Sequence, residues 1–256
     1  MSYALIAGGS NGIGYAIAEA LAKRKYDLVL VARHSTTLET ARQQLETKYG
    51  IKVFLLVFDL SQENSAEEIS AWCFKNNITL KILCNVAGIG GTADFLSSSL
   101  PEMQYMIRLN VTSATALTIK LLPLLQKEAP AYILNVASMA AFAPIPSKNI
   151  YSTTKSAVLY FSYSLRYQLK KQKISVSALC PGPVFTKPEI KKTTVEKMGR
   201  IGIMMAVSPA RVGEIAVKGL LNKRMIIIPG VLSKIMSVAL RIFPRRLVTY
   251  IYHKMG

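Results

Sequence analysis

Short apolar runs alternate with amphipathic stretches along the whole chain, and this alternation limits the fold more than any other feature. The amphipathic stretches are long enough for helices, which a parallel connection needs in order to return the chain to the start of the next strand. The apolar runs are bounded by turn residues and predict buried strands at 3–7, 27–32, 53–58, 82–84, 131–136, 174–179 and 225–228. We therefore predict an α/β fold, a Rossmann-like, doubly wound and mainly parallel sheet of seven strands with helices on both faces.

A chain of 256 residues suits a single domain, and no repeat or linker divides it. Two segments depart from the regular rhythm. Residues 181–207 hold three prolines before Ser208-Pro209 starts the next helix, and they predict a long mobile loop that acts as a substrate lid. Residues 231–256 form a basic amphipathic C-terminal extension.

The formal net charge of +18 is concentrated beyond residue 186. The cations there are mixed with aliphatic residues, and no nucleic-acid-binding module is visible, so nucleic acid is disfavoured and an anionic membrane surface or an anionic substrate fits better. No secretory leader pattern and no apolar stretch of about 18 residues occurs, so we expect a cytoplasmic protein. Cys73, Cys84 and Cys180 are expected to be reduced and buried, without a metal.

A glycine-rich turn at 7–14 follows the first predicted strand directly and opens a predicted helix at 13–24. Glycines allow the backbone to turn sharply and to approach a pyrophosphate, whose charge meets the free N–H groups of the helix N-terminus. In this context the pattern predicts a dinucleotide site, with cofactor-binding residues Gly8, Ser10, Asn11, Gly12, Ile13 and Gly14.

The residues at the ends of the next strands indicate which dinucleotide binds and where its adenosine part lies. The second predicted strand ends in Arg33-His34, where a site for NAD usually has an acid, so Arg33 favours the 2′-phosphate of NADP(H), with NAD(H) as the alternative. Asp59 and Leu60 follow the third strand, where the carboxylate can accept from the adenine amino group. The turn Asn85-Val86-Ala87-Gly88 follows the fourth, and we expect Asn85, Ala87 and Gly88 to close over the adenosine side.

Tyr151 and Lys155 are four residues apart on one face of a predicted helix, a spacing that arises about once by chance in so tyrosine- and lysine-rich a chain. The pair becomes a more specific signal together with two other residues, Asn110 before the fifth predicted strand and Ser138 at its end. The chain resembles the short-chain dehydrogenase/reductase (SDR) family over nearly its whole length. The matching features are the glycine turn, residues 85–88, Asn110, Ser138, Tyr151, Lys155, Pro181-Gly182 and Thr186.

The resemblance implies a catalytic tetrad of Asn110, Ser138, Tyr151 and Lys155 and an oxidoreductase of the CH–OH/C=O type. It also implies cofactor contacts at Tyr151, Lys155, Pro181, Gly182, Val184 and Thr186. Two positions depart from the family's pattern, since Ala7 replaces a threonine and Val86 replaces an asparagine. Both are supporting positions, so they affect the rigidity of the turns rather than the chemistry.

The chemistry of the pair also follows from charge alone. A phenol with a pKa near 10 is a poor base at neutral pH, and a neighbouring ammonium lowers that pKa by favouring the phenolate. Tyr151 beside Lys155 is therefore a candidate general acid/base. Ser138 would hold the carbonyl oxygen where negative charge develops. Under the resemblance, Asn110 would bend its helix and hold a water that joins Lys155 to solvent.

The substrate is predicted to be a lipophilic carbonyl or alcohol compound, such as a 3-oxoacyl thioester, a sphingoid ketone or a steroid. The residues expected to line its pocket are Ser138, Met139, Ile145, Tyr151 and Phe185, together with apolar lid residues such as Ile201. Lys191 and Lys192 in the lid suit a substrate with an anionic head.

Residues 231–256 resemble the extension of DltE-like oxidoreductases and membrane-associated oxoacyl reductases. Short apolar helices flanked by cations suit peripheral association with an anionic membrane, and packing on a partner subunit is an equal alternative. By analogy with the family we expect a homodimer or homotetramer, paired through the helices around 103–125 and 151–170. The rival functions are a non-catalytic NADP(H)-binding sensor or scaffold protein at a membrane surface and a nucleic-acid-binding role for the basic third.

Overall fold

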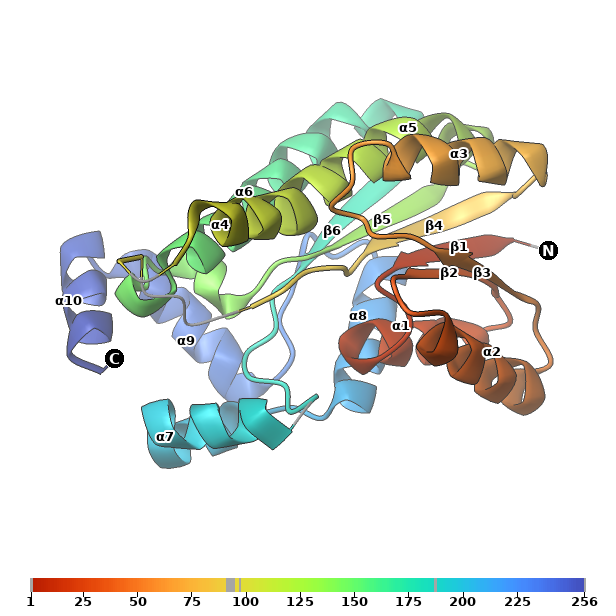
Figure 1. Cartoon of the computed structure of the whole chain (residues 1–256). Coiled ribbons are helices and arrows are strands. Elements are labelled where there is room, and N and C mark those ends of the chain that lie inside the picture. Colours follow the sequence, from red (N-terminus) through yellow and green to blue (C-terminus); the bar gives the residue numbers. More distant parts are fainter. Residues whose placement is uncertain (1, 91–94, 97, 187, 256) are drawn as a thin grey trace.

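Seven parallel strands form one sheet in the order β3-β2-β1-β4-β5-β6-β7 (Figure 1). The computed structural model describes residues 2–90, 95–96, 98–186 and 188–255; for residues 188, 189, 191, 193, 197, 198, 200, 201 and 255 it describes the backbone alone. The predicted doubly wound sheet is confirmed. The strands are β1 (Tyr3–Ala7), β2 (Asp27–Ala32), β3 (Val53–Val57), β4 (Leu80–Asn85), β5 (Ala131–Val136), β6 (Ile174–Leu179) and β7 (Ile226–Ile227).

Helices cover both faces of the sheet, as a parallel sheet requires (Figure 1). One face carries α1 (Gly12–Ala22), α2 (Ser35–Tyr49) and α8 (Pro209–Leu221). The other carries α3 (Ser65–Lys75), α4 (Leu100–Ile107), α5 (Ser113–Lys127) and α6 (Asn149–Gln168). Each layer has its own buried aliphatic cluster against the sheet. The strand order reverses between β1 and β4, so the carboxyl ends of these strands border the crevice in which such folds bind ligands.

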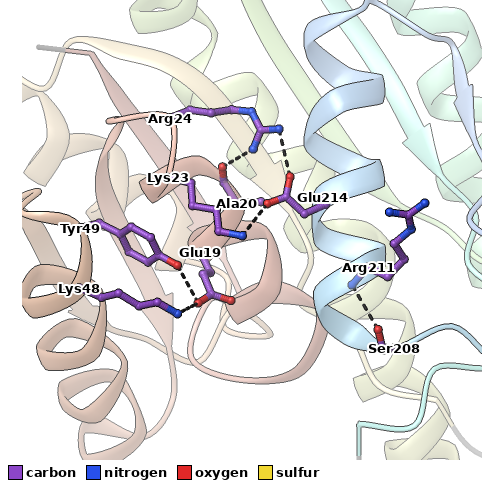
Figure 2. A network of polar contacts seen from close by, with 9 residues as sticks. All are labelled: Glu19, Ala20, Lys23, Arg24, Lys48, Tyr49, Ser208, Arg211 and Glu214. Atoms are coloured by element: carbon purple, nitrogen blue, oxygen red, sulfur yellow. Dashed lines mark hydrogen bonds and ion pairs between the residues drawn. The ribbon is translucent and has the colours of Figure 1, made fainter.

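Helix α8 packs closely against α1, the helix that follows the glycine turn. Gly213 of α8 lies so close that a Cβ atom there would be 2.3 Å from the carbonyl oxygen of Ala16. Glu214 accepts hydrogen bonds from Lys23 and Arg24, each at 3.0 Å, and Glu19 accepts from Lys48 and Tyr49 of α2 (Figure 2). These partners lower the pKa of both carboxyl groups, led in each case by the hydrogen bond to a lysine.

The expected loop at 181–207 is wrong for most of its length, because residues Pro188–Met205 form helix α7 with non-helical backbone at Gly199. Proline lacks an N–H, but the first turn of a helix has no intrahelical use for one, so Pro188 starts a helix here rather than preventing it. Ser208 caps α8 as expected, with its hydroxyl accepting from the backbone N–H of Arg211. Lys191 and Ile201 have side chains outside the described part of the structure.

The C-terminal extension is two helices, α9 (Val231–Ile242) and α10 (Arg245–Met255). Both helices lie beyond the carboxyl ends of the strands, at the left of Figure 1. Leu240 and Val248 are buried in a third apolar cluster with Met139 and Phe142. Among the described residues, no helix is long and apolar enough to cross a bilayer.

Candidate active site

The glycine turn is closed so tightly that side chains are excluded from it. Gly8 and Gly12 have positive φ values of 89° and 57°, and a Cβ atom on Gly14 would lie 1.9 Å from the carbonyl oxygen of Gly8. Asn11, the residue before α1, is in extended conformation. Ser10, Asn11 and Gly12 line an open hollow of about 450 Å³ with residues of α2, so the N-terminus of α1 faces accessible space.

Two strand ends on the adenosine side present polar side chains at the surface. Arg33 and His34 follow β2 and are exposed, and the Arg33 guanidinium donates to the phenol oxygen of Tyr105 at 2.6 Å. Asp59 follows β3 and accepts from the N–H and the hydroxyl of Ser61 at 2.9 and 2.7 Å. Leu60 is buried in the core, so only its backbone is at hand for a ligand.

The side chain of Asn85 points into the core instead of toward the crevice. Its amide donates to Asn135 at 2.8 Å and to Thr118 at 3.1 Å, and Asn135 donates in turn to Ser162 at 2.9 Å. A series of hydrogen bonds between buried side chains therefore links β4 and β5 to helices α5 and α6. Only the backbone of Asn85 remains for the cofactor contact expected there.

The turn after β4 lies between the glycine turn and the polar side chains of Asn110 and Lys155. The N–H groups of Val86 and Ala87 donate to the carbonyl oxygen of Ala7 at 2.9 and 2.7 Å, so the two turns lie side by side despite the residues at Ala7 and Val86 that depart from the family's pattern. A Cβ atom on Gly88 would lie 2.9 Å from Oδ1 of Asn110 and 3.2 Å from Nζ of Lys155.

Asn110 sits in one turn of π-helix, Arg108–Thr112, between α4 and α5. The local bend expected at this residue is thus present as a widened turn. Its side chain makes paired bonds with the backbone of Ile89, accepting at 2.8 Å and donating at 2.9 Å, and also donates to Thr154 at 3.0 Å. With 2% of its surface exposed, Asn110 is fixed among its partners.

Lys155 is 5% exposed, which is rare for a lysine. Its Nζ donates to the carbonyl oxygen of Val136 at 2.9 Å and lies 5.9 Å from the ring centre of Tyr151. Burial lowers the pKa of the Lys155 ammonium to about 8, partly opposed by Cys180. A cation whose pKa has moved this close to neutrality is the type of group that functional sites contain.

Tyr151 and Ser138 meet from two different elements. Burial raises the pKa of the Tyr151 phenol, and a side-chain hydrogen bond with Ser138 works in the opposite direction. Ser138 ends the segment after β5 and caps the short helix η2 (Met139–Phe142), accepting from the N–H of Ala140 at 3.1 Å. Gly90 lies beside the Tyr151 ring, since a Cβ atom there would be 3.6 Å from Cε2 of the ring.

The segment after β6 closes the other side of the crevice. The Pro181 carbonyl accepts from the N–H of Met139 at 3.0 Å, and a Cβ atom on Gly12 would lie 3.2 Å from the methyl group of Thr186. Gly182 lies against Ser233 of α9. Val184 is buried in the core, so its backbone is the part that faces the crevice.

The residues predicted to line the substrate pocket are not equally available. Ile145 and Phe185 are half-buried, and Ser138 and Tyr151 are likewise partly open. Met139 is 9% exposed and packs in the third apolar cluster. It therefore supports the pocket wall more than it lines it.

Three residues that support the site were not among those predicted from the sequence. Thr154 is hydrogen-bonded to Asn110, and its place directly before Lys155 is a signal within the helix. Arg245 of α10 donates to the carbonyl oxygens of Phe142 at 2.5 Å and Leu240 at 3.0 Å, while Arg241 stacks over the Phe142 ring at 5.0 Å. Sequence gives no signal for these arginines, because the contact exists only once the chain is folded.

The four polar groups and the glycine turn thus share one edge of the sheet, in an arrangement suited to proton transfer beside a dinucleotide. A model of the short chain dehydrogenases matches residues 2–198. The chain belongs to the short-chain dehydrogenase family. The narrower resemblance of residues 231–256 to DltE-like enzymes stays a prediction.

Several members of the family are similar in sequence or structure. The very-long-chain 3-oxoacyl-CoA reductase-A of Danio rerio is 30% identical over 200 residues, which are 76% of this chain and 62% of that protein. The NADP-dependent 3-hydroxy acid dehydrogenase of Schizosaccharomyces pombe is 32% identical over 185 residues, 72% of this chain and 71% of that one. The L-sorbose reductase of Gluconobacter frateurii, solved with NADPH and L-sorbose, superposes with a TM-score of 0.81 at 26% identity, covering 90% of this chain and 95% of that chain.

Proposed function

We propose that this short-chain dehydrogenase is an NADP(H)-dependent oxidoreductase that interconverts a ketone and a secondary alcohol, with Tyr151 as the general acid/base. One observation carries the proposal: Tyr151 meets Ser138 and the buried Lys155 next to Asn110 and the turn that follows β4. A structural surface tyrosine needs neither a buried ammonium nor a serine partner.

The crevice fits a dinucleotide phosphate cofactor. The side-chain-free turn at Gly8 and Gly14 admits a pyrophosphate to the N-terminus of α1. In the proposal Arg33, which is exposed and hydrogen-bonded to Tyr105, binds the 2′-phosphate, and the relatives named for NADP or solved with NADPH support NADP(H) as the cofactor. NAD(H) is the alternative, and a direct comparison of the two cofactors tests it.

The proton chemistry belongs to the protein, while the bound reduced cofactor supplies the hydride. Tyr151 gives its proton to the carbonyl oxygen as negative charge develops there and takes it back in the reverse direction. Lys155, charged below about pH 8, stabilises the phenolate that remains. Ser138 donates a hydrogen bond to the reacting oxygen, and such a preorganised donor is worth about 3 kcal/mol in other enzymes.

In the proposal Asn110 does not touch the substrate and acts through the groups that it positions. Its amide bonds to Ile89 and Thr154 hold the widened helix turn beside Gly88 and Lys155. In the proposed mechanism this geometry holds a water that returns protons from solvent to Lys155.

A lipophilic substrate is proposed because Ile145 and Phe185, two of the side chains expected to line the pocket, are apolar and only half-buried. The relative that acts on very-long-chain 3-oxoacyl-CoA supports this class. The sorbose reductase shows that the same fold also serves a polar sugar, so the substrate panel must contain both kinds.

The proposal extends to the assembly and the location of the enzyme. Exposed apolar side chains on α5 and α6, namely Ile119, Tyr160 and Tyr167, suit the pairing of two subunits through these helices in a homodimer or homotetramer. We place the proposed enzyme in the cytoplasm, where it would reach a membrane only peripherally, through residues 231–256.

The test is oxidation of NADPH and NADH, followed at 340 nm, against small diketones, sugars, steroids and long-chain 3-oxoacyl thioesters. Tyr151→Phe is expected to lose at least about a thousandfold in turnover and to keep NADPH binding. Tyr160→Phe, on an exposed part of the same helix, is the matched control and should behave as the wild type. Equal turnover in both variants contradicts the proposal.

The rival function, a non-catalytic NADP(H)-binding sensor or scaffold, uses the same cofactor crevice. It predicts tight NADPH binding without turnover of any compound in the panel. The burial of Lys155 against Tyr151 argues against it, because a sensor has no use for a desolvated ammonium at that place.

A further inference from the structure

Helix α9 turns its apolar residues outward and its serines inward, the reverse of an ordinary surface helix. Val231, Ile235, Val238 and Ile242 are 74%, 61%, 51% and 74% exposed and recur at helical spacing, so they form one stripe. The buried positions of the same helix are Ser233, Ser237 and Leu240. We call the four exposed residues the outer stripe.

The apolar exposure continues through the next helix. Phe243 at the junction is 52% exposed, and on α10 the side chains of Leu247, Tyr250 and Ile251 are 45%, 59% and 47% exposed. The inner side of α10 is anchored, because Val248 is buried with Leu240. Contiguous apolar exposure of this kind marks an interaction surface.

Positive charge surrounds this surface. Residues 231–256 contain Lys234, Arg241, Arg245, Arg246 and Lys254 and neither aspartate nor glutamate. All five are exposed, and within the described residues none of them forms an ion pair, although Arg241 and Arg245 also contact Phe142 on the inner side. Such helices match an anionic bilayer surface, because their apolar side chains can enter the acyl boundary while their cations meet the anionic headgroups.

We propose that the outer stripe of α9, with the exposed face of α10, docks on the surface of an anionic lipid bilayer. A helix of 12 residues is about 18 Å long and cannot span the hydrocarbon core, so the helices lie in the interface. A second copy fits less well. Two-fold pairing of this face would bring the same cations together without a carboxylate in the segment to neutralise them.

The docking face and the candidate active site lie on opposite sides of the same two helices. Arg245 on the inner side holds Phe142, the last residue of the short helix that Ser138 caps. Gly182, after β6, lies against Ser233 of α9. Docking therefore sets the site beside the bilayer, where a lipophilic substrate is dissolved. The docking surface does not depend on the proposed reaction, so the two proposals can be contradicted separately.

The experiment is co-sedimentation of the full-length protein with vesicles of phosphatidylcholine alone and with 30% phosphatidylglycerol. The wild type is expected to bind the anionic vesicles at least tenfold more tightly than the neutral ones. Ile235→Glu with Ile242→Glu should abolish sedimentation, while Phe74→Glu, on the exposed side of α3, should not affect it. NADPH oxidation with a water-soluble diketone, measured in parallel, should be the same in all three proteins.

Two results would overturn the proposal. One is vesicle binding that the Ile235→Glu, Ile242→Glu protein retains in full. The other is no vesicle binding by the wild type, together with a dimer in analytical ultracentrifugation that the double variant dissociates, which would assign the outer stripe to a second copy. Vesicle binding without any turnover would support the docking surface and contradict the proposed function alone.

Discussion

The guanidinium of Arg33 donates a 2.6 Å hydrogen bond to the phenol oxygen of Tyr105, 72 residues further along the chain. The bond joins the end of β2 to α4, two elements from different halves of the sheet. It holds a long exposed cation in one position at the adenosine end of the crevice, so less side-chain freedom is lost when a phosphate binds.

Replacing either partner should change cofactor preference in a graded way. Arg33→Asp is expected to weaken NADPH binding by about 10- to 100-fold and to favour NADH, because a charge-assisted bond is lost and a like charge faces the phosphate. Tyr105→Phe should weaken NADPH by only about threefold and leave NADH unchanged. Fluorescence titration with both cofactors measures this, and equal losses for NADH and NADPH would contradict the role of Arg33.

The lowered pKa of Lys155 predicts a pH dependence of NADPH binding. Burial lowers this pKa to about 8, so the amine is charged at pH 7 and neutral at pH 9. An anionic cofactor prefers the charged form, and its dissociation constant should therefore rise with pH through about 8, by at most about tenfold per pH unit. The dissociation constant for Lys155→Met should be higher and flat over this range.

The control for that titration is Lys171→Met, which removes a charge from an exposed position after α6. This variant should reproduce the wild-type curve. A break near pH 8 that persists in Lys155→Met would assign it to another group.

Gly213 sets the distance between α8 and α1. Gly213→Ala places a methyl group 2.3 Å from the carbonyl oxygen of Ala16, and overpacking of this kind costs about 1–3 kcal/mol. Because the shift moves the glycine-turn helix, NADPH affinity should fall together with the melting temperature. Gly50→Ala, with no described atom within 4 Å but a φ of 61°, should lower stability by about 1 kcal/mol and leave NADPH affinity unchanged. Unchanged NADPH affinity in Gly213→Ala would contradict this coupling.

Arg245 is predicted to be a positioning residue for Ser138. Arg245→Met removes the bonds to the carbonyl oxygens of Phe142 and Leu240 and should loosen the short helix that Ser138 caps. We expect kcat to fall about tenfold, from about 1.5 kcal/mol of lost hydrogen bonding, with NADPH affinity unchanged. Arg246→Met, which removes the neighbouring exposed charge, is the control in an assay with a soluble substrate. Equal kcat values in the two variants would show that the bonds to Phe142 do not position Ser138.

The strands and the placing of Tyr151 and Lys155 on one helix were predictable from sequence because both depend on local pattern. Strands β1, β2, β5 and β6 are almost wholly buried on both faces, and they have the predicted bounds. Tyr151 and Lys155 share a helix, so their spacing alone puts them on one face.

What the sequence did not show depends on long-range contact. Asn85 stands at a strand end, and only the neighbouring Asn135 and Thr118 decide that its amide turns into the core. The prolines around α7 mimic a loop, although Pro188 occupies a position where a helix tolerates it. The direction of the outer stripe was likewise open, because periodicity gives an apolar face without saying whether the fold covers it.

The packing of α8 on α1 also has a consequence for biosynthesis. Lys23 and Glu214, which pair across these helices, are 191 residues apart. At about 5–20 residues per second, the ribosome delivers α8 on the order of ten seconds or more after α1. During that interval the nascent glycine turn has no helix behind it, and its apolar back is open to chaperones. The glycine turn is therefore among the first parts of the chain to be translated and among the last to become rigid.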